Sequence, residues 1–366
     1  MNSALPPNAG ALILGVLLSG AALLCAPDGV LAENTTAVDE EEPAEPTPLN
    51  QSWTFSAYFE NDLFWDTDAN YTNGVKLSWI SPDITEFTDR KELPPWSHGL
   101  IELLPFINEP GLQRNIVFSL GQNIYTPEDI ERRDLVEDDR PYAGWLYLGT
   151  AFHNRNPGRH DSIEVQLGVI GPLSAAEQAQ TLVHELRDIP KPNGWTHQLD
   201  NEPGIAIIYE RKWRLFRRHG VTGFGVDFVP HVGAAIGNVY TYANAGFEAR
   251  FGYHLPSDFG NSMIRAAGDT SSPVDSADPR RKRQLGFHLF ASVDGRAVAR
   301  DIFLDGNTFG ASHSVDKKHF VADLAVGASV LGGPWKLTFA RVLRTREFKG
   351  QPDNHQFGSM VLSYTF

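Results

Sequence analysis

The sequence HQFGSMVLSYTF (355–366) alternates large apolar residues with mostly small or polar ones, with a period of two. Met360, Leu362, Tyr364 and Phe366 would therefore point to one face of a β-strand, and the residues between them to the other. This strand also ends the chain, on an aromatic residue. Such a strand is typical of β-barrels that cross a membrane.

The same period recurs in WTFSAYFE (53–60), GVKLSW (74–79) and SIEVQLGV (162–169). A soluble β-sandwich shows this alternation too, so no single strand decides between the two folds. Many runs are long enough to cross a bilayer at a tilt, and aromatic residues gather at their ends. We therefore predict an all-β fold, a twelve-stranded antiparallel transmembrane β-barrel of the outer membrane, with strands near 53–63, 71–80, 113–122, 143–153, 161–170, 203–214, 221–233, 239–253, 284–297, 318–330, 334–344 and 355–366.

The first 50 residues have a different composition from the predicted barrel. Residues 11–26 form an apolar run, and Val30-Leu31-Ala32 has the small-residue pattern of a signal-peptidase site, although residues 1–10 contain no Lys or Arg. We predict a signal peptide at 1–32 and export to the cell outer membrane. Residues 33–50 are acidic and rich in proline, which predicts a disordered lead-in. The single barrel domain would then cover 51–366.

Composition excludes several classes of function. The formal net charge of −14 argues against nucleic-acid binding, which selects basic surfaces. Cys25 is the only cysteine and lies in the predicted signal peptide, so the exported chain has no thiol for a disulfide or a metal site. No G-x-S-x-G motif is present, which excludes the nucleophile elbow of α/β-hydrolases. The inward face of the strands is polar, with Glu60, Lys76, Glu164, Gln166, His288 and Asp323.

Strand parity assigns each connection to one side of the membrane. With the N-terminus in the periplasm, the outward loops contain 64–70, 123–142, 171–202, 234–238, 298–317 and 345–354. The third of these loops holds a helix-like stretch at 174–188. The periplasmic side receives short turns at 154–160, 216–220 and 331–333, and two longer connections, 81–112 and 254–283.

Several polar groups fall on the outward rim. Asp62 and Thr72 would meet across a hairpin, and Gln180 and His184 would share one face of the helix-like stretch because they are four residues apart. The loop at 123–142 adds an arginine pair at 132–133 together with Asp139 and Arg140. Each group has an ordinary alternative, namely turn chemistry, a solvated histidine, or arginines that bind neighbouring lipid phosphates. Their convergence on one rim favours a functional site.

The residue types at this rim limit the chemistry. An oxygen-rich site at Asp62 suits a hard cation such as calcium, which can polarise an ester carbonyl. A neutral His184 can remove a proton from water. The other histidine pairs, His153 with His160 and His313 with His319, lack the spacing of a zinc helix motif.

The sequence resembles the outer-membrane lipid A 3′-O-deacylase family from about residue 53 to the C-terminus, more closely in the first half. The matching segments are FSAYFENDLFWDTDANYTNGVKLSW (55–79), GQNIYTPEDIERRD (121–134), DRPYAGWLYLGT (139–150), GVIGP (168–172), Gln180 with His184, and WTHQLDNEPG (195–204). Arg132 stands where the family has lysine, so the alignment of this loop can shift by one residue.

The resemblance implies a twelve-stranded barrel and calcium-dependent hydrolysis of the 3′-linked acyloxyacyl ester of lipid A. The catalytic positions would be His184, Asn61, Asp62 and Thr72, with Asp62 as the metal ligand. Arg132, Arg133 and Gln180 would contact substrate. Strict parity points Asn61 out of the lumen, so we expect a β-bulge at the end of the first strand.

Two other functions remain open at this point. One is a non-enzymatic barrel, either a small pore or an adhesion scaffold, and the other is an esterase that acts on glycerophospholipid. We expect the partner to be lipid A or lipopolysaccharide in the outer leaflet, and the protein to be a membrane-embedded monomer.

Overall fold

The structure is a computed structural model that describes residues 52–62, 70–84, 109, 111–261, 263–264 and 268–366. Between 70 and 72 it describes the backbone alone. The predicted signal peptide and the acidic lead-in lie outside the described residues, as does most of the 81–112 connection.

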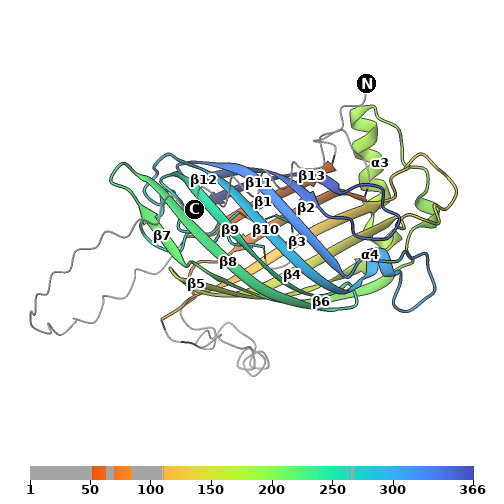
Figure 1. Cartoon of the computed structure of the whole chain (residues 1–366), viewed down its shortest axis with the longest axis horizontal. Coiled ribbons are helices and arrows are strands. Elements are labelled where there is room, and N and C mark those ends of the chain that lie inside the picture. Colours follow the sequence, from red (N-terminus) through yellow and green to blue (C-terminus); the bar gives the residue numbers. More distant parts are fainter. Residues whose placement is uncertain (1–51, 63–69, 85–108, 110, 262, 265–267) are drawn as a thin grey trace, which may run out of the picture. The chain divides into compact units, whose positions relative to one another are not determined.

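Thirteen strands form one antiparallel sheet in the described part of the chain (Figure 1). They are β1 (Thr54–Asn61), β2 (Asn70–Ile80), β3 (Gln113–Thr126), β4 (Ala143–Asn156), β5 (Arg159–Ile170), β6 (Glu202–Trp213), β7 (Phe216–His219), β8 (Phe224–Gly237), β9 (Tyr240–Tyr253), β10 (Gly286–Asp301), β11 (Phe320–Gly332), β12 (Trp335–Arg344) and β13 (His355–Thr365). The helices are α3 (Ala176–Arg187) and α4 (Ile302–Asp305), with short 3-10 turns η2 (Pro172–Ser174) and η3 (Trp195–His197).

The sheet closes into a ring of twelve strands. Strands that are neighbours in sequence pair with one another, except β6 and β7; β1 also pairs with β13, and β6 pairs with β8. The extra strand β7 pairs with β8 just beyond β6, so β6 and β7 follow one another along the same partner. The twelve-stranded barrel is therefore confirmed. The turn predicted at 216–220 is wrong, because pairing resumes at Phe216 and the chain turns at 220–223.

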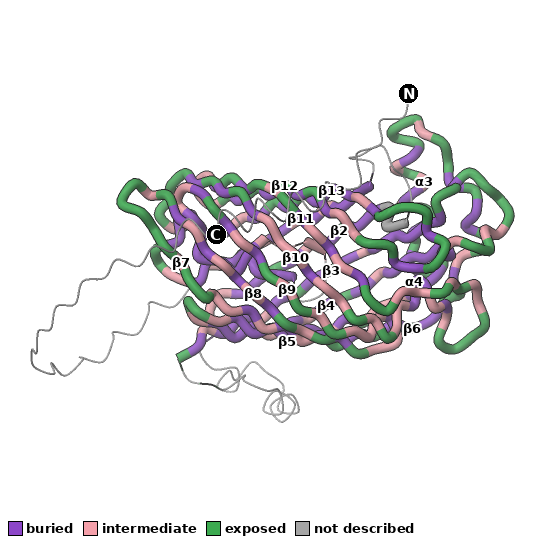
Figure 2. Tube along the Cα trace, in the orientation of Figure 1, coloured by how far each residue is buried: buried purple, intermediate pink, exposed green. Residues whose placement is uncertain are grey.

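Buried and exposed positions alternate along the strands of the barrel wall (Figure 2). The inner face is polar and the outer face is apolar. In β12, Lys336 and Thr338 are buried in the lumen, whereas Leu337 and Phe339 are exposed. Successive side chains of a strand point to opposite sides, so an alternating sequence yields one face suited to lipid and one suited to water. The inward positions predicted from the sequence are all buried polar residues, namely Glu60, Lys76, Glu164, Gln166, His288 and Asp323.

We call the long connection between β9 and β10 (residues 254–285) the lumenal segment. Most of its described residues are buried, and they bond to the inner face of the barrel. Asp258 receives Arg250 Nη1 at 2.6 Å and Lys336 Nζ at 2.8 Å, so one carboxylate joins β9 to β12. Asp269 receives Lys76 Nζ at 2.6 Å. This connection is longer than a turn between two strands requires, and its additional residues fill the lumen.

Candidate functional site

The predicted site residues lie at one end of the barrel, the α3 end. Figure 1 shows α3 and α4 at this end and β7 at the other. Neighbouring strands are antiparallel, so the end of β1, the start of β2 and the loops after β3 and β5 meet there. This topology brings residues more than a hundred positions apart to one rim.

The β1–β2 hairpin carries the first group. Asn61 pairs with Asn73, and Asp62 follows the strand directly. Both Asn61 and Asp62 are buried. The bulge expected in β1 is wrong, because β1 keeps regular pairing as far as Asn61. The irregularity is on β2, where the register with β3 shifts between Tyr71 and Asn73 and so includes Thr72.

Helix α3 carries the second group, on a buried stripe. Ala176, Gln180 and His184 are its buried residues, and their spacing of four places them on one face. Trp195 Nε1 donates to Gln180 Oε1 at 2.9 Å, and Gln122 Nε2 donates to the Ser174 carbonyl at 2.6 Å. The first bond ties α3 to η3, and the second ties η2, which immediately precedes α3, to β3, so the stripe faces the barrel.

The end of α3 fixes the tautomer of His184. Asp188 adopts a left-handed conformation (φ 55°), which ends the helix and turns the chain back toward His184. His184 Nδ1 then lies 2.5 Å from the Pro190 carbonyl oxygen. A carbonyl can only accept, so Nδ1 must carry the proton and Nε2 is the basic nitrogen of the neutral ring. This tautomer is the one that a general base requires.

The loop between β3 and β4 carries the arginines. Arg132 and Arg133 are exposed, and neither forms an ion pair within the described part of the chain. Asn193 anchors their loop to the one that follows α3, because its backbone N–H donates to the Ile130 carbonyl (2.8 Å) and its side chain to the Glu131 carbonyl (3.1 Å). The two arginines are thus available to an anionic ligand at the rim.

Arg140 has a different environment from the two exposed arginines. It is buried, donates to Glu347 at 2.7 Å, and lies over the rings of Tyr125 and Phe348. Burial opposes ionisation of Glu347, but Arg140 and Arg344 outweigh it and lower the pKa of this carboxyl to about 2. Arg140 is therefore a structural residue that ties the β3–β4 loop to the β12–β13 loop.

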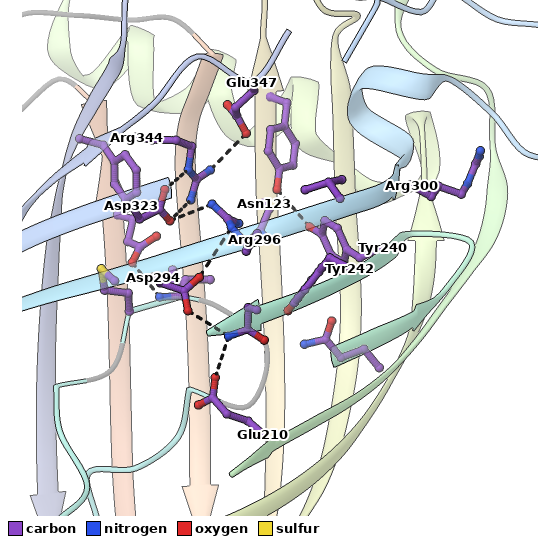
Figure 3. Close-up of a pocket in the computed structure, with 18 of the residues that line it drawn as sticks. Asn123, Glu210, Tyr240, Tyr242, Asp294, Arg296, Arg300, Asp323, Arg344 and Glu347 are labelled. Atoms are coloured by element: carbon purple, nitrogen blue, oxygen red, sulfur yellow. Dashed lines mark hydrogen bonds and ion pairs between the residues drawn. The ribbon is translucent and has the colours of Figure 1, made fainter. Parts of the chain in front are cut away.

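A polar cavity of about 90 Å³ lies inside the barrel (Figure 3). Its charges largely neutralise one another, since Arg344 makes two bonds to Asp323 (2.8 and 2.9 Å) and Arg296 makes a third (2.9 Å). Sequence analysis did not single out this network of three strands. Glu60 lines the cavity, but none of the described site residues does. The cavity is part of the polar lumen, and the candidate site lies elsewhere.

The structure places Gln180 and His184 on one buried face and buries Asn61 and Asp62 at the same barrel end. It leaves Arg132 and Arg133 at the surface of that end. No group of three or more His, Cys, Asp or Glu side chains that could hold a metal ion occurs among the described residues. Within the same residues, no helix is long and apolar enough to cross a membrane.

A family profile described as "Outer membrane protein LpxR" matches residues 17–366. The chain belongs to the LpxR family. Among solved structures, LpxR from Salmonella typhimurium matches with a TM-score of 0.68 and 19% identity, covering 86% of this chain and 100% of that one. The β domain of the Bordetella autotransporter BrkA matches with a TM-score of 0.41 and 9% identity, covering 86% and 98%. No curated protein matches the chain in sequence.

LpxR membership confirms the resemblance inferred from the sequence motifs. It establishes the chain as an outer-membrane β-barrel protein. It also establishes the class of enzyme, because LpxR proteins are ester hydrolases that act as lipid A 3′-O-deacylases. Lipid A is accordingly the substrate that membership implies.

Proposed function

We propose that the chain hydrolyses the 3′-O-linked acyloxyacyl ester of lipid A in the outer leaflet, with His184 as general base and calcium held at Asp62. The observation that carries this proposal is the hydrogen bond between His184 Nδ1 and the Pro190 carbonyl. It leaves Nε2 as the basic nitrogen of a neutral imidazole on the buried face of α3. A positioned histidine of this kind contributes about 10²–10⁴-fold to a proton-transfer step.

The residues at the end of β1 fit a calcium ion. Asp62 offers a carboxylate on a buried side chain. Calcium accepts carboxylate, amide, backbone carbonyl and water oxygens, so one carboxylate with neutral oxygens is a suitable donor set. When bound, the ion would polarise the ester carbonyl and stabilise negative charge on its oxygen.

The chain's own residues then act in order. His184 Nε2 takes a proton from water as the water oxygen bonds to the ester carbonyl carbon. The tetrahedral intermediate collapses by breaking the bond to the 3′ oxygen of the sugar. His184 returns its proton to that oxygen, giving a 3′-hydroxyl and a free acyloxyacyl acid. Asn61 and Thr72 orient the water or the developing oxyanion, and Gln180 contacts substrate.

The exposed arginines suit the head group of this substrate. Arg132 and Arg133 can donate charge-assisted hydrogen bonds to a sugar phosphate at the rim. They would also offset the repulsion between an acidic protein and an anionic lipid, since the chain carries a formal charge of −14.

The pore alternative is disfavoured by the lumenal segment, which crosses the interior and bonds to Lys76 on β2 and to Arg250 on β9, on opposite sides of the ring. An experiment distinguishes lipid A from the alternative substrate, glycerophospholipid. We would express the protein in a strain with 3′-acylated lipid A and analyse lipid A and phospholipids by mass spectrometry, with and without calcium. Loss of the 3′ acyloxyacyl unit in calcium is the expected result. Unchanged lipid A with increased lysophospholipid would replace the proposed substrate, and channel currents without any lipid change would replace the enzyme with a pore.

A further inference from the structure

Strand β1 contacts the lumenal segment at three successive inward positions. Ser56 Oγ lies 3.0 Å from Ser271 Oγ, and Tyr58 OH donates to Asp269 Oδ1 at 2.9 Å. At the third position, the Ile264 backbone N–H donates to Glu60 Oε1 at 2.7 Å. The inner face of β1 is therefore attached to the lumenal segment along most of its length.

The contact at Glu60 differs from the other two in its position and its partners. Its Oε1 also accepts from Ser359 Oγ at 2.9 Å, and Ser359 is the residue of β13 that pairs with Glu60. The side chain is almost fully buried, with 1% of its surface exposed. One carboxylate oxygen thus joins β1, β13 and the lumenal segment at the last inward position before Asn61 and Asp62.

We propose that Glu60 is a positioning residue for the site at the end of β1, and that it acts by accepting these two hydrogen bonds. Asp62 is the residue that directly follows the strand, so its direction depends on where the strand ends. The bonds from Ile264 and Ser359 fix that end from two sides. Groups that orient a metal ligand commonly change metal affinity by about 10–100-fold when removed. The inference rests on the proposed function, because it takes Asp62 as the calcium ligand.

Substitutions at Glu60 separate hydrogen bonding from charge. Glu60→Gln retains an oxygen that can accept both bonds but removes the negative charge. Glu60→Ala removes both. Ser56→Ala and Tyr58→Phe are matched controls, because each removes one contact between the same face of β1 and the same lumenal segment, farther from Asp62.

The test uses the full chain folded in detergent micelles with lipid A. The calcium concentration that gives half-maximal deacylation is measured for each variant, together with the affinity for Tb³⁺ as a luminescent calcium substitute. Asp62→Asn identifies the part of the Tb³⁺ signal that belongs to this site. We expect Glu60→Ala to weaken both quantities about tenfold or more, Glu60→Gln to stay within about twofold of wild type, and both controls to leave them unchanged.

Three results would overturn the inference: unchanged affinities in Glu60→Ala, an equal loss in Glu60→Gln, or equal losses in the two controls. Wild type that lacks an Asp62-dependent Tb³⁺ signal would overturn it as well. Failure of the proposed function has a different signature. Wild type would then bind Tb³⁺ through Asp62 without releasing the 3′ acyl group, and the Tb³⁺ affinities of the Glu60 variants would still decide the positioning role.

Discussion

Helix α3 and the lumenal segment both belong to long polar connections between strands, but different kinds of interaction attach them to the barrel. Helix α3 buries three of its residues and is attached by neutral hydrogen bonds, such as those at Gln180 and His184. The lumenal segment buries charged residues, and Asp258 alone receives Arg250, Arg280 and Lys336. The charged groups of the lumenal segment are already paired inside the barrel and serve the fold. Among the described residues, those at the α3 end have fewer ion pairs within the chain, so they can contact a substrate.

The largest expected effect breaks the chemistry of α3 and leaves the fold intact. Replacement of His184 by alanine removes the proposed base, so kcat for deacylation should fall about 10²–10⁴-fold while the barrel still folds. His197→Ala is the control, because His197 is an exposed histidine in the same loop. Wild-type turnover in His184→Ala, measured by mass spectrometry of lipid A, would remove histidine from the mechanism.

The next largest effect is expected from removing a buried carboxylate of the lumenal segment. Asp258→Ala leaves Arg250, Arg280 and Lys336 in the lumen without their shared carboxylate, and should lower the free energy of unfolding by about 3–5 kcal/mol. Denaturant unfolding of the folded protein in lipid measures this. The control Asp316→Asn breaks an exposed pair with Lys349 and should cost less than about 1 kcal/mol. Equal losses would show that the lumenal pairs contribute no more than surface pairs.

A smaller effect tests the ion pair that ties the rim loops together. The pKa of Glu347 is lowered to about 2, so its ionised form stabilises the fold above the ordinary glutamate pKa, and this contribution is lost as pH falls toward 2. Glu347→Gln should therefore destabilise the protein by about 1–3 kcal/mol at neutral pH. The gap between mutant and wild type should close below about pH 4. Thermal unfolding across that range measures it, and a gap that does not depend on pH would exclude the Arg140 pair as the cause.

The smallest effect sharpens the role of the exposed rim. Arg132→Ala combined with Arg133→Ala should raise KM about tenfold for phosphorylated lipid A, because two charge-assisted contacts to phosphate are lost. Substrate without the phosphate should show no such difference. Arg187→Ala, which removes an exposed arginine from the end of α3, is the control. An equal rise in KM for both substrates would mean that the two arginines do not contact phosphate.

Much of the wall could be predicted from the sequence, because a strand's period of two is a local property. The strands begin and end within a few residues of their predicted positions in most cases, and every inward residue named from parity is buried. The exceptions arise where pairing changes register. Between β6 and β7, pairing with β8 is interrupted at Arg214–Leu215 and resumes one residue out of step, which local alternation does not reveal. Beside Asn61, the register shift lies on β2, between Tyr71 and Asn73, and local alternation does not reveal it either.

The lumenal segment could not be predicted in this way. Its composition of Asp, Arg, Ser and Pro is that of an exposed loop. It is buried because strands distant in sequence supply partners, as Lys76 does for Asp269 and Arg155 does for Ser272. Charged groups enter a barrel interior only when such partners are present, and their presence depends on closure of the whole ring.

The sequence by itself determined the barrel, its polar lumen and the three groups of the rim, because alternation, spacing and motif are properties of neighbouring residues. Only the tertiary structure decided which polar residues are committed to the fold. It separated Arg140, which is paired with Glu347, from the exposed Arg132 and Arg133. It also assigned the tautomer of His184 through a carbonyl six residues away. The physical reason is that a side chain's protonation and pairing depend on groups within a few ångströms, and the folded chain alone brings those groups together.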